Sequence, residues 1–227
     1  MSITPLSFET GYVERRSRLT TFFRLILAIP HFVLAWAWGI AIYFVVIVAW
    51  FALLFTGGWP RGLYDFTASY MRYMTYLYGY LALLTDDYPP FGGGADERYP
   101  VRLNIGEPKP RYDRLKVGLR LFLLIPVVII LFAMSLVWQI GALIAWFAIV
   151  ILGKQPRGLQ DMIALGLSYQ QRAYAYALLV DEQFPPITGP DPALSAGPGP
   201  GPPLPPPATE TAPENPATGA PHGPVTG

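Results

Sequence analysis

The sequence predicts an all-α integral membrane protein built from two tandem repeats, and three observations support this. Hydrophobic residues make up 52% of the chain and charged residues only 14%, well below the roughly 25% charged in an average soluble domain. The apolar residues are gathered in two long blocks. The segment WFALLFTGGWPRGLYDF, which begins at Trp50, also has a similar second copy, WFAIVILGKQPRGLQDM, which begins at Trp146.

Each apolar block is long enough to lie within a bilayer. Residues 19–55 contain a single charge, Arg24, and residues 121–152 contain none, whereas about 18 uncharged residues already indicate a membrane helix. The first block follows basic residues and could mimic a signal peptide. We reject that interpretation because the equivalent block of the second repeat is internal, where no signal peptide could act.

The repeat defines the organisation of the chain. A shift of 96 residues aligns 15–90 with 111–186 without a gap, and about 26 of the 76 aligned positions are identical, which indicates tandem duplication. The predicted parts are an N-terminal segment at 1–14, a first membrane repeat at 15–92, a linker at 93–110, a second membrane repeat at 111–187 and a disordered Pro/Gly-rich tail at 188–227. The tail is predicted to be disordered because it cannot bury enough apolar surface to offset its ordering entropy.

A glycine and proline loop follows each apolar block. Gly57 and Gly153 suit the left-handed position after a helix, and Pro60 and Pro156 suit the first turn of the next one. In the segment that follows, apolar residues recur at steps of three and four, which predicts an amphipathic helix at the membrane interface in each repeat.

Two topologies remain open for each repeat. In the favoured one, residues 19–55 form an apolar helical hairpin that turns near Gly39, and the amphipathic helix lies on the membrane surface. In the other, one membrane helix covers 30–55 and the segment 63–84 crosses back. That arrangement places Arg72 near mid-membrane, at a cost of about 2.5 to 3.5 kcal/mol.

Both topologies give four crossings with both termini on one side. The basic residues in 15–24 and 98–120 assign that side to the cytoplasm. We therefore expect a multi-pass protein of the cell membrane with cytoplasmic termini. Because each repeat ends on the side where it begins, we also expect an approximate two-fold axis along the membrane normal.

The quoted residues support a family resemblance. AIPHFVLAWAWGIAIYFVVIVAWFALLFTGGWPRGLYDF followed by LALLTDDYPPF resembles the bacterial domain of unknown function 4389 family, and the match covers 22–91. The second repeat resembles the same family more loosely, keeping IP, AWFA, PRGL and FPP. The resemblance implies an integral membrane domain that occurs singly or in tandem, with no established activity and no catalytic residues.

Six residues near the amphipathic helices are candidate contacts to lipids or partners: Trp59, Arg61, Asp65, Arg72, Arg157 and Asp161. Arg61 and Asp65 are four residues apart, as are their equivalents, so the simplest interpretation is a local ion pair. The alternative is that Arg61 and Arg157, with Trp59, contact lipid phosphates or a partner's carboxylate.

Other polar residues are interpreted mainly as structural. His31 is a candidate proton relay inside an apolar block, although a bond to a backbone carbonyl freed by Pro30 explains it equally well. Arg24 and Arg120 are expected to snorkel toward the membrane surface. The paired acids Asp86-Asp87 and Asp181-Glu182 are expected to be solvated loop residues.

The sequence favours a non-enzymatic role without cofactor or metal. It contains no cysteine and only two histidines, which excludes thiolate chemistry and makes a haem or metal centre unexpected. We expect a scaffold or accessory subunit that binds membrane lipids, other membrane proteins or a second copy of itself, and no nucleic acid. The alternative is a small transporter or channel, for which the apolar blocks offer few polar groups: His31, Tyr43, Ser135 and Gln139.

Overall fold

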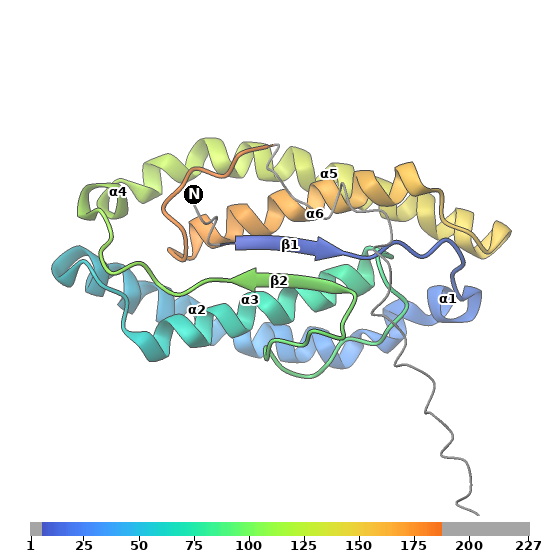
Figure 1. Cartoon of the computed structure of the whole chain (residues 1–227), viewed down its shortest axis with the longest axis horizontal. Helices are drawn as coiled ribbons and strands as arrows, with labels where there is room; N and C mark the ends of the chain where they lie inside the picture. Colours follow the sequence, from blue (N-terminus) through green and yellow to red (C-terminus); the bar gives the residue numbers. More distant parts are fainter. Residues whose placement is uncertain (1–5, 188–227) are drawn as a thin grey trace, which may run out of the picture.

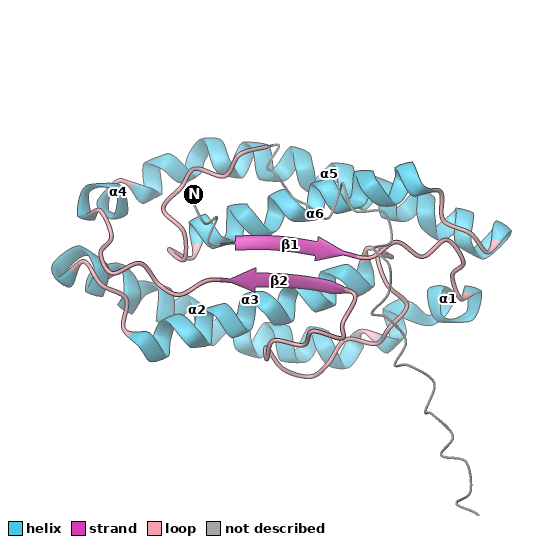
Figure 2. Cartoon of the chain, in the orientation of Figure 1, coloured by secondary structure: helices cyan, strands magenta, loops and turns pink. Residues whose placement is uncertain are grey.

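The computed structural model describes residues 6–187 as a mostly helical molecule with one small sheet (Figures 1 and 2). In chain order the elements are β1 (Leu6–Thr10), α1 (Arg18–Leu27), α2 (Ile29–Thr56), α3 (Arg61–Leu81), β2 (Val101–Ile105), α4 (Arg114–Gly118), α5 (Arg120–Leu152) and α6 (Arg157–Ala177). The mostly helical fold is confirmed, whereas the sheet was not predicted. The predicted disordered tail lies outside the described residues.

The helix ends follow the repeat closely. α3 and α6 begin at Arg61 and Arg157, which are equivalent positions, each directly after a proline. α2 and α5 end one residue before Gly57 and Gly153, which adopt φ angles of 75° and 73°. Glycine takes this left-handed conformation without the steric cost that a β-carbon would impose, so it ends the helix and turns the chain.

The predicted hairpin within each apolar block was wrong. α2 runs unbroken through Gly39, the expected turn, and α5 is likewise continuous. The hydroxyl of Tyr70, on α3, lies 3.6 Å from the place that a β-carbon of Gly39 would occupy. A β-carbon there would be in ordinary van der Waals contact, so Gly39 neither turns the chain nor is required for the packing of α2 on α3. The helix bounds match the second topology, with one long helix followed by an antiparallel return helix.

The two repeats contact each other through reciprocal pairs of equivalent residues. Nε1 of Trp50 donates to the carbonyl of Val117 at 3.0 Å, and Nε1 of the equivalent Trp146 donates to the carbonyl of Thr21 at 3.2 Å. Val117 and Thr21 are also equivalent positions, so the same bond forms from the first repeat to the second and from the second to the first. The repeats are therefore related by an approximate two-fold axis.

The backbone at the ends of the long helices shows the same exchange. The N–H of Tyr112 donates to the carbonyl of Gly57 at 2.8 Å, and the N–H of Arg16 donates to that of Gly153 at 3.2 Å. Each long helix thus ends against the start of the other repeat, so α2 and α5 run antiparallel (Figure 1). The two-fold axis that relates the repeats is therefore roughly perpendicular to α2 and α5. The four-crossing topologies required this axis to run parallel to the membrane-crossing helices.

The sheet is a further pair of equivalent elements. β1 and β2 each precede the first helix of their own repeat and pair antiparallel, with Phe8 opposite Leu103 at the centre. Alternate side chains point to opposite faces of a strand. Phe8, Val101 and Leu103 are buried against the helices, whereas Glu9 and Arg102 lie on the outer face and form an ion pair of 2.9 Å.

The elements form three layers. The sheet covers α3 and α6, and α2 and α5 lie behind those helices in the view of Figure 1. α3 and α6 are therefore enclosed, and they carry many of the largest fully buried side chains: Met71, Tyr73, Tyr76, Leu77, Tyr80, Ile163, Leu167 and Tyr169. The sheet covers the side of the amphipathic helices that was expected to face water, whereas their position at the membrane interface stays a prediction.

Candidate functional site

An exposed apolar surface covers the outer sides of α1, α2 and α5. On α2 it includes Phe32, Val33, Trp36, Ile40, Phe44, Val48, Phe51 and Phe55, and on α5 it includes Phe122, Ile125, Ile129, Phe132, Ile140, Ile144, Phe147 and Ile151. Both helices are long and apolar enough to cross a membrane. Contiguous exposed apolar patches of this kind mark sites of contact with a membrane or another protein. The surface therefore suits contact with a membrane or with another protein.

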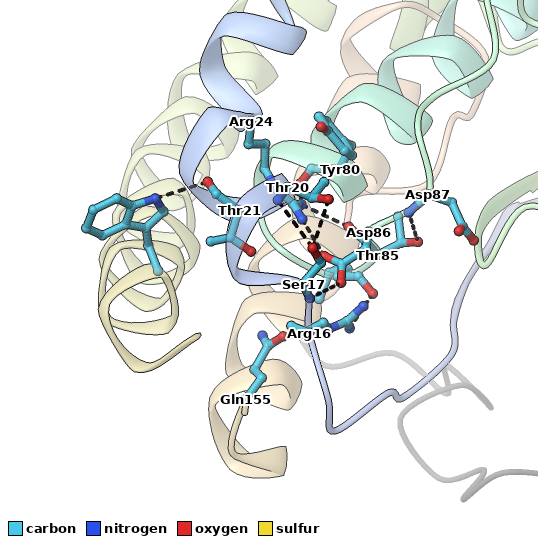
Figure 3. Close-up of polar contacts among 12 residues, drawn as sticks. Arg16, Ser17, Thr20, Thr21, Arg24, Tyr80, Thr85, Asp86, Asp87 and Gln155 are labelled. Atoms are coloured by element: carbon cyan, nitrogen blue, oxygen red, sulfur yellow. Dashed lines mark hydrogen bonds and ion pairs between the residues drawn. The ribbon is translucent and has the colours of Figure 1, made fainter. Parts of the chain in front are cut away.

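Arg24 is the centre of a buried polar cluster in the first repeat (Figure 3). Its side chain is 3% exposed, donates to the carbonyls of Tyr80 and Thr85, and forms an ion pair of 2.6 Å with Asp86. The guanidinium also lies 4.4 Å from the centre of the Tyr80 ring. Burial lowers the pKa of Arg24, and the nearby Asp86 carboxylate opposes that shift. Arg24 fixes the end of α3, so the predicted snorkelling role was wrong.

Asp86 is likewise a structural residue and not a solvated loop acid. Its carboxylate accepts the N–H of Ser17, the residue that caps α1, at 2.9 Å. The neighbouring Arg16 extends the cluster by donating to the carbonyl of Leu84 at 2.8 Å and to Oε1 of Gln160 at 3.2 Å. These bonds join the start of the first repeat, the end of α3 and the start of α6.

The second repeat has an equivalent but less complete cluster. Arg120 is 2% exposed, donates to the carbonyl of Asp181 at 2.9 Å and lies 4.0 Å from the centre of the Tyr176 ring. Its Nε and Nη2 atoms have no hydrogen-bond partner within residues 6–187. Arg120 is thus also a buried residue and not a snorkelling one.

The predicted contact residues differ in their accessibility. Arg61 and Asp65 are 62% and 60% exposed and form the predicted ion pair at 3.6 Å, while Arg61 also pairs with Glu107 at 3.0 Å. These acids raise the pKa of Arg61, with Glu107 making the larger contribution. Trp59 is buried and its Nε1 donates to the carbonyl of Leu179 at 2.9 Å. Trp59 is therefore enclosed by other residues of the chain, and its contact with lipid stays a prediction.

The remaining predicted contacts lie apart from one another. The guanidinium of Arg157 lies 5.5 Å from the centre of the Tyr12 ring. Asp161 is exposed one turn further along α6, and Arg72 is half-buried on α3. The structure does not bring the predicted contact residues into one site, and their role toward lipids or partners stays a prediction.

His31 is fully buried among aromatic side chains of the first repeat. Its Nδ1 lies 2.8 Å from the hydroxyl of Tyr73, which also donates to the carbonyl of His31 at 3.2 Å, and Phe91 stacks on the imidazole at 4.3 Å. The side-chain partner is thus Tyr73 and not a carbonyl freed by Pro30. The sequence pattern did not single out Tyr73 or Phe91, because only the return of α3 and the loop that follows it bring these residues to His31. A proton-relay role stays a prediction.

A groove with a volume of about 510 Å³ opens where Tyr78 of α3 faces α5 and α6. Ser135, Gln139 and Gln170 contribute polar atoms to its wall, and Nε1 of Trp138 donates to Oε1 of Gln170 at 2.8 Å. Ser135 and Gln139 were singled out in the sequence as polar groups of the second apolar block. The groove brings these two together, whereas His31 lies in the aromatic cluster.

Comparison with known proteins supports the family and not an activity. No curated protein and no solved structure matches the chain. A family model described as a domain of unknown function (DUF4389) matches residues 18–92 and again residues 114–188. The two matches coincide with the two repeats and together cover more than half of the chain, which confirms the resemblance and the duplication. The chain therefore belongs to the DUF4389 family and carries two tandem copies of its domain.

Proposed function

We propose that this protein is a membrane-bound, non-enzymatic scaffold that holds its apolar surface in lipid and presents its sheet to partner proteins. The observation that carries the proposal is the placement of the exposed apolar side chains of α2 and α5 on the layer opposite the charged outer face of the sheet. The buried polar groups around Arg24 and His31 bond to the chain itself, which supports a structural role for them.

The lengths of the long helices favour an orientation along the membrane plane. At 1.5 Å per residue, the 28 residues of α2 and the 33 of α5 extend roughly 42 and 50 Å. Both exceed the ~30 Å thickness of the hydrocarbon core. Tilt can accommodate such helices, so length supports this orientation without deciding it.

The position of the sheet supports the same orientation more strongly. β1 and β2 run alongside α3 and α6 near the middle of the molecule (Figure 1). If the long helices stood upright, the Glu9–Arg102 ion pair and the exposed Asn104 would lie beside lipid at mid-depth, where charged groups cost about 2.5 to 3.5 kcal/mol each. With the helices in the plane, the sheet faces water and the two-fold axis lies along the membrane normal.

The cell-membrane location and the cytoplasmic side are part of this proposal. Basic residues of the segments around the sheet, among them Arg98, Arg102 and Lys109, favour the cytoplasmic face. The multi-pass arrangement with both termini in the cytoplasm is the alternative. It requires α2 and α5 to cross in opposite directions, which would place equivalent loops of the two repeats on opposite sides.

Equivalent loops therefore offer a direct test of the orientation. Gly58 and Lys154 occupy equivalent positions at opposite ends of the molecule, and the natural chain has no cysteine to remove. We expect Gly58→Cys and Lys154→Cys to respond alike in intact cells, both protected from a membrane-impermeant thiol reagent and both labelled by a permeant one. Asn104→Cys, on the sheet, serves as the matched control. It should also be protected from the impermeant reagent and labelled by the permeant one. Labelling of one loop but not the other would establish crossing helices.

The scaffold role needs a second test. Affinity purification in mild detergent should recover a defined membrane protein with the natural chain and lose it when Glu9→Ala and Asn104→Ala are combined on the outer face of the sheet. The exposed change Lys116→Ala, on α4 beyond the end of the sheet (Figure 1), should leave recovery intact. A chain that purifies alone would contradict the scaffold proposal.

The transporter or channel alternative is favoured by one observation, the groove lined by Ser135, Gln139 and Gln170. It predicts that the purified protein moves a solute across the bilayer of proteoliposomes and that Gln139→Leu reduces the flux. Flux together with labelling of only one of the two equivalent loops would replace the scaffold proposal with this alternative.

A further inference from the structure

The two arginine clusters differ in how the charge is neutralised. In the first repeat Asp86 lies 2.6 Å from the guanidinium of Arg24. In the second repeat the equivalent acid, Glu182, accepts the backbone N–H of Asp113 and faces Lys109 at 3.5 Å. Arg120 therefore has no carboxylate within ion-pair distance among residues 6–187.

A buried charge without a counter-ion is costly. Removing a charged group from water carries an effective penalty of several kcal/mol unless a partner and hydrogen bonds compensate it. Arg120 has one hydrogen bond to the carbonyl of Asp181 and the ring of Tyr176, while Nε and Nη2 have no partner within the described part of the chain. Arg120 thus has two unused donors and no carboxylate in direct contact, although Tyr176, Glu182 and Asp181 favour its charged form from nearby.

A cavity of about 250 Å³ adjoins Arg120 where α2 meets α5 and the end of α6. Apart from Arg120 its walls are apolar and include Val46, Trp50, Leu124 and Leu179. Two further wall residues, Ile47 and Leu121, also belong to the exposed apolar surface. The cavity therefore connects a buried cation with the surface that faces lipid.

We propose that this cavity binds a long-chain fatty acid, whose carboxylate pairs with Arg120 and whose hydrocarbon chain follows the apolar walls toward the exposed surface. The carboxylate supplies the counter-ion that Asp86 supplies to Arg24 in the first repeat. The proposal goes beyond the scaffold role and does not depend on the orientation of the long helices.

The free edge of the guanidinium favours a carboxylate. The N–H groups of Nε and Nη2 lie on one edge and match the two oxygens of a carboxylate in parallel hydrogen bonds. A phosphate would bring further charged oxygens against walls that offer no donors, which carries a desolvation cost. The volume lies below the roughly 300–1,000 Å³ of common ligand pockets, which suits one chain and not a two-chain lipid.

Binding to the full-length protein tests the proposal. After exchange into fresh mild detergent, native mass spectrometry with added palmitate should show one bound molecule per chain. Methyl palmitate, which lacks the charge, and lysophosphatidic acid, which carries a phosphate, should each bind at least tenfold more weakly. Tighter binding of lysophosphatidic acid than of palmitate would overturn the choice of a carboxylate.

Three variants distinguish the contribution of the arginine charge to palmitate binding from that of the cavity walls. Arg120→Gln should weaken palmitate binding at least tenfold, and Ala177→Leu, which installs the first-repeat residue in the cavity wall, should do the same while keeping the arginine. Arg111→Gln removes an exposed arginine that is not among the candidate contact residues and should leave binding unchanged. If Arg120→Gln does not fold, Ala177→Leu decides. Equal binding by the natural chain and Ala177→Leu would show uptake on the general apolar surface and overturn the proposal.

Discussion

The two repeats share their helix ends and their family match, yet their helix pairs are spaced differently. In the second repeat, Gly166 brings α6 so close to α5 that a β-carbon there would lie 2.9 Å from the carbonyl of Met134. In the first repeat the same two positions hold Tyr70 and Trp38, whose rings pack edge to face at 5.9 Å. Large aromatic residues thus separate α2 from α3, and a glycine allows α5 and α6 to approach.

The residues that face two equivalent buried tyrosines also differ between the repeats. Tyr73 in the first repeat bonds to His31, whereas the equivalent Tyr169 faces Val127 in the second. The Tyr169 hydroxyl has no hydrogen-bond partner among the described residues. The first repeat therefore joins His31 to a tyrosine across its helices, whereas the second places an apolar residue near the equivalent tyrosine and packs its helices more closely.

The largest expected effect tests the arginine clusters. Arg24→Leu should lower the free energy of unfolding by about 3 kcal/mol, because it leaves Asp86 without its counter-ion and two carbonyls without their side-chain donor. Arg120→Leu should cost much less, since it removes a charge that lacks an ion-pair partner. Denaturant unfolding in mild detergent measures both. Equal losses would show that the two clusters are equivalent after all.

The next effect tests the close approach in the second repeat. Gly166→Ala should cost about 2 kcal/mol, because the new methyl group meets backbone that cannot easily move. At Gly158, in the first turn of the same helix, an added β-carbon would have no atom of the described residues within 4 Å. Gly158→Ala should therefore be neutral or slightly stabilising, and denaturant unfolding compares the two variants. A neutral Gly166→Ala would place the two helices further apart.

A smaller effect tests the polar interiors. Tyr73→Phe should cost about 1 kcal/mol, because His31 loses its side-chain partner. Tyr169→Phe should be neutral or stabilising, because its hydroxyl is buried without a partner among residues 6–187. Thermal unfolding of the two variants side by side gives the comparison. Similar losses would reveal a partner for Tyr169, such as a bound water.

The smallest effect concerns the exposed pair at the start of α3. Arg61→Ala should lower the melting temperature slightly in low salt and not measurably in high salt, because exposed ion pairs are weak and screened. Asp65→Ala serves as the matched change on the other side of the pair. A loss that persists in high salt would indicate that Arg61 has a structural role beyond this pair.

Sequence signals located parts of the candidate sites but not their partners. His31, Ser135 and Gln139 stand out as polar residues in apolar blocks, so composition alone identified them. The burial of Arg24 and Arg120 was missed, because a basic residue near the end of an apolar block has the same pattern whether it snorkels or is enclosed. Only the return of α3 and α6 over these arginines distinguishes the two.

Neighbouring residues encode the helix ends at Gly57 and Gly153 and the starts of α3 and α6, because the glycine and proline signals lie within a few positions. The duplication follows from comparing the two halves of the sequence, and the two apolar blocks follow from composition. Tertiary structure alone decided the antiparallel placement of α2 and α5, the pairing of β1 with β2 and the enclosure of α3 and α6. The physical reason is distance along the chain. These features depend on contacts between different residues of the two repeats, such as the Trp50–Val117 and Trp146–Thr21 bonds, which join positions 67 and 125 residues apart. No local pattern of hydrophobicity encodes such contacts.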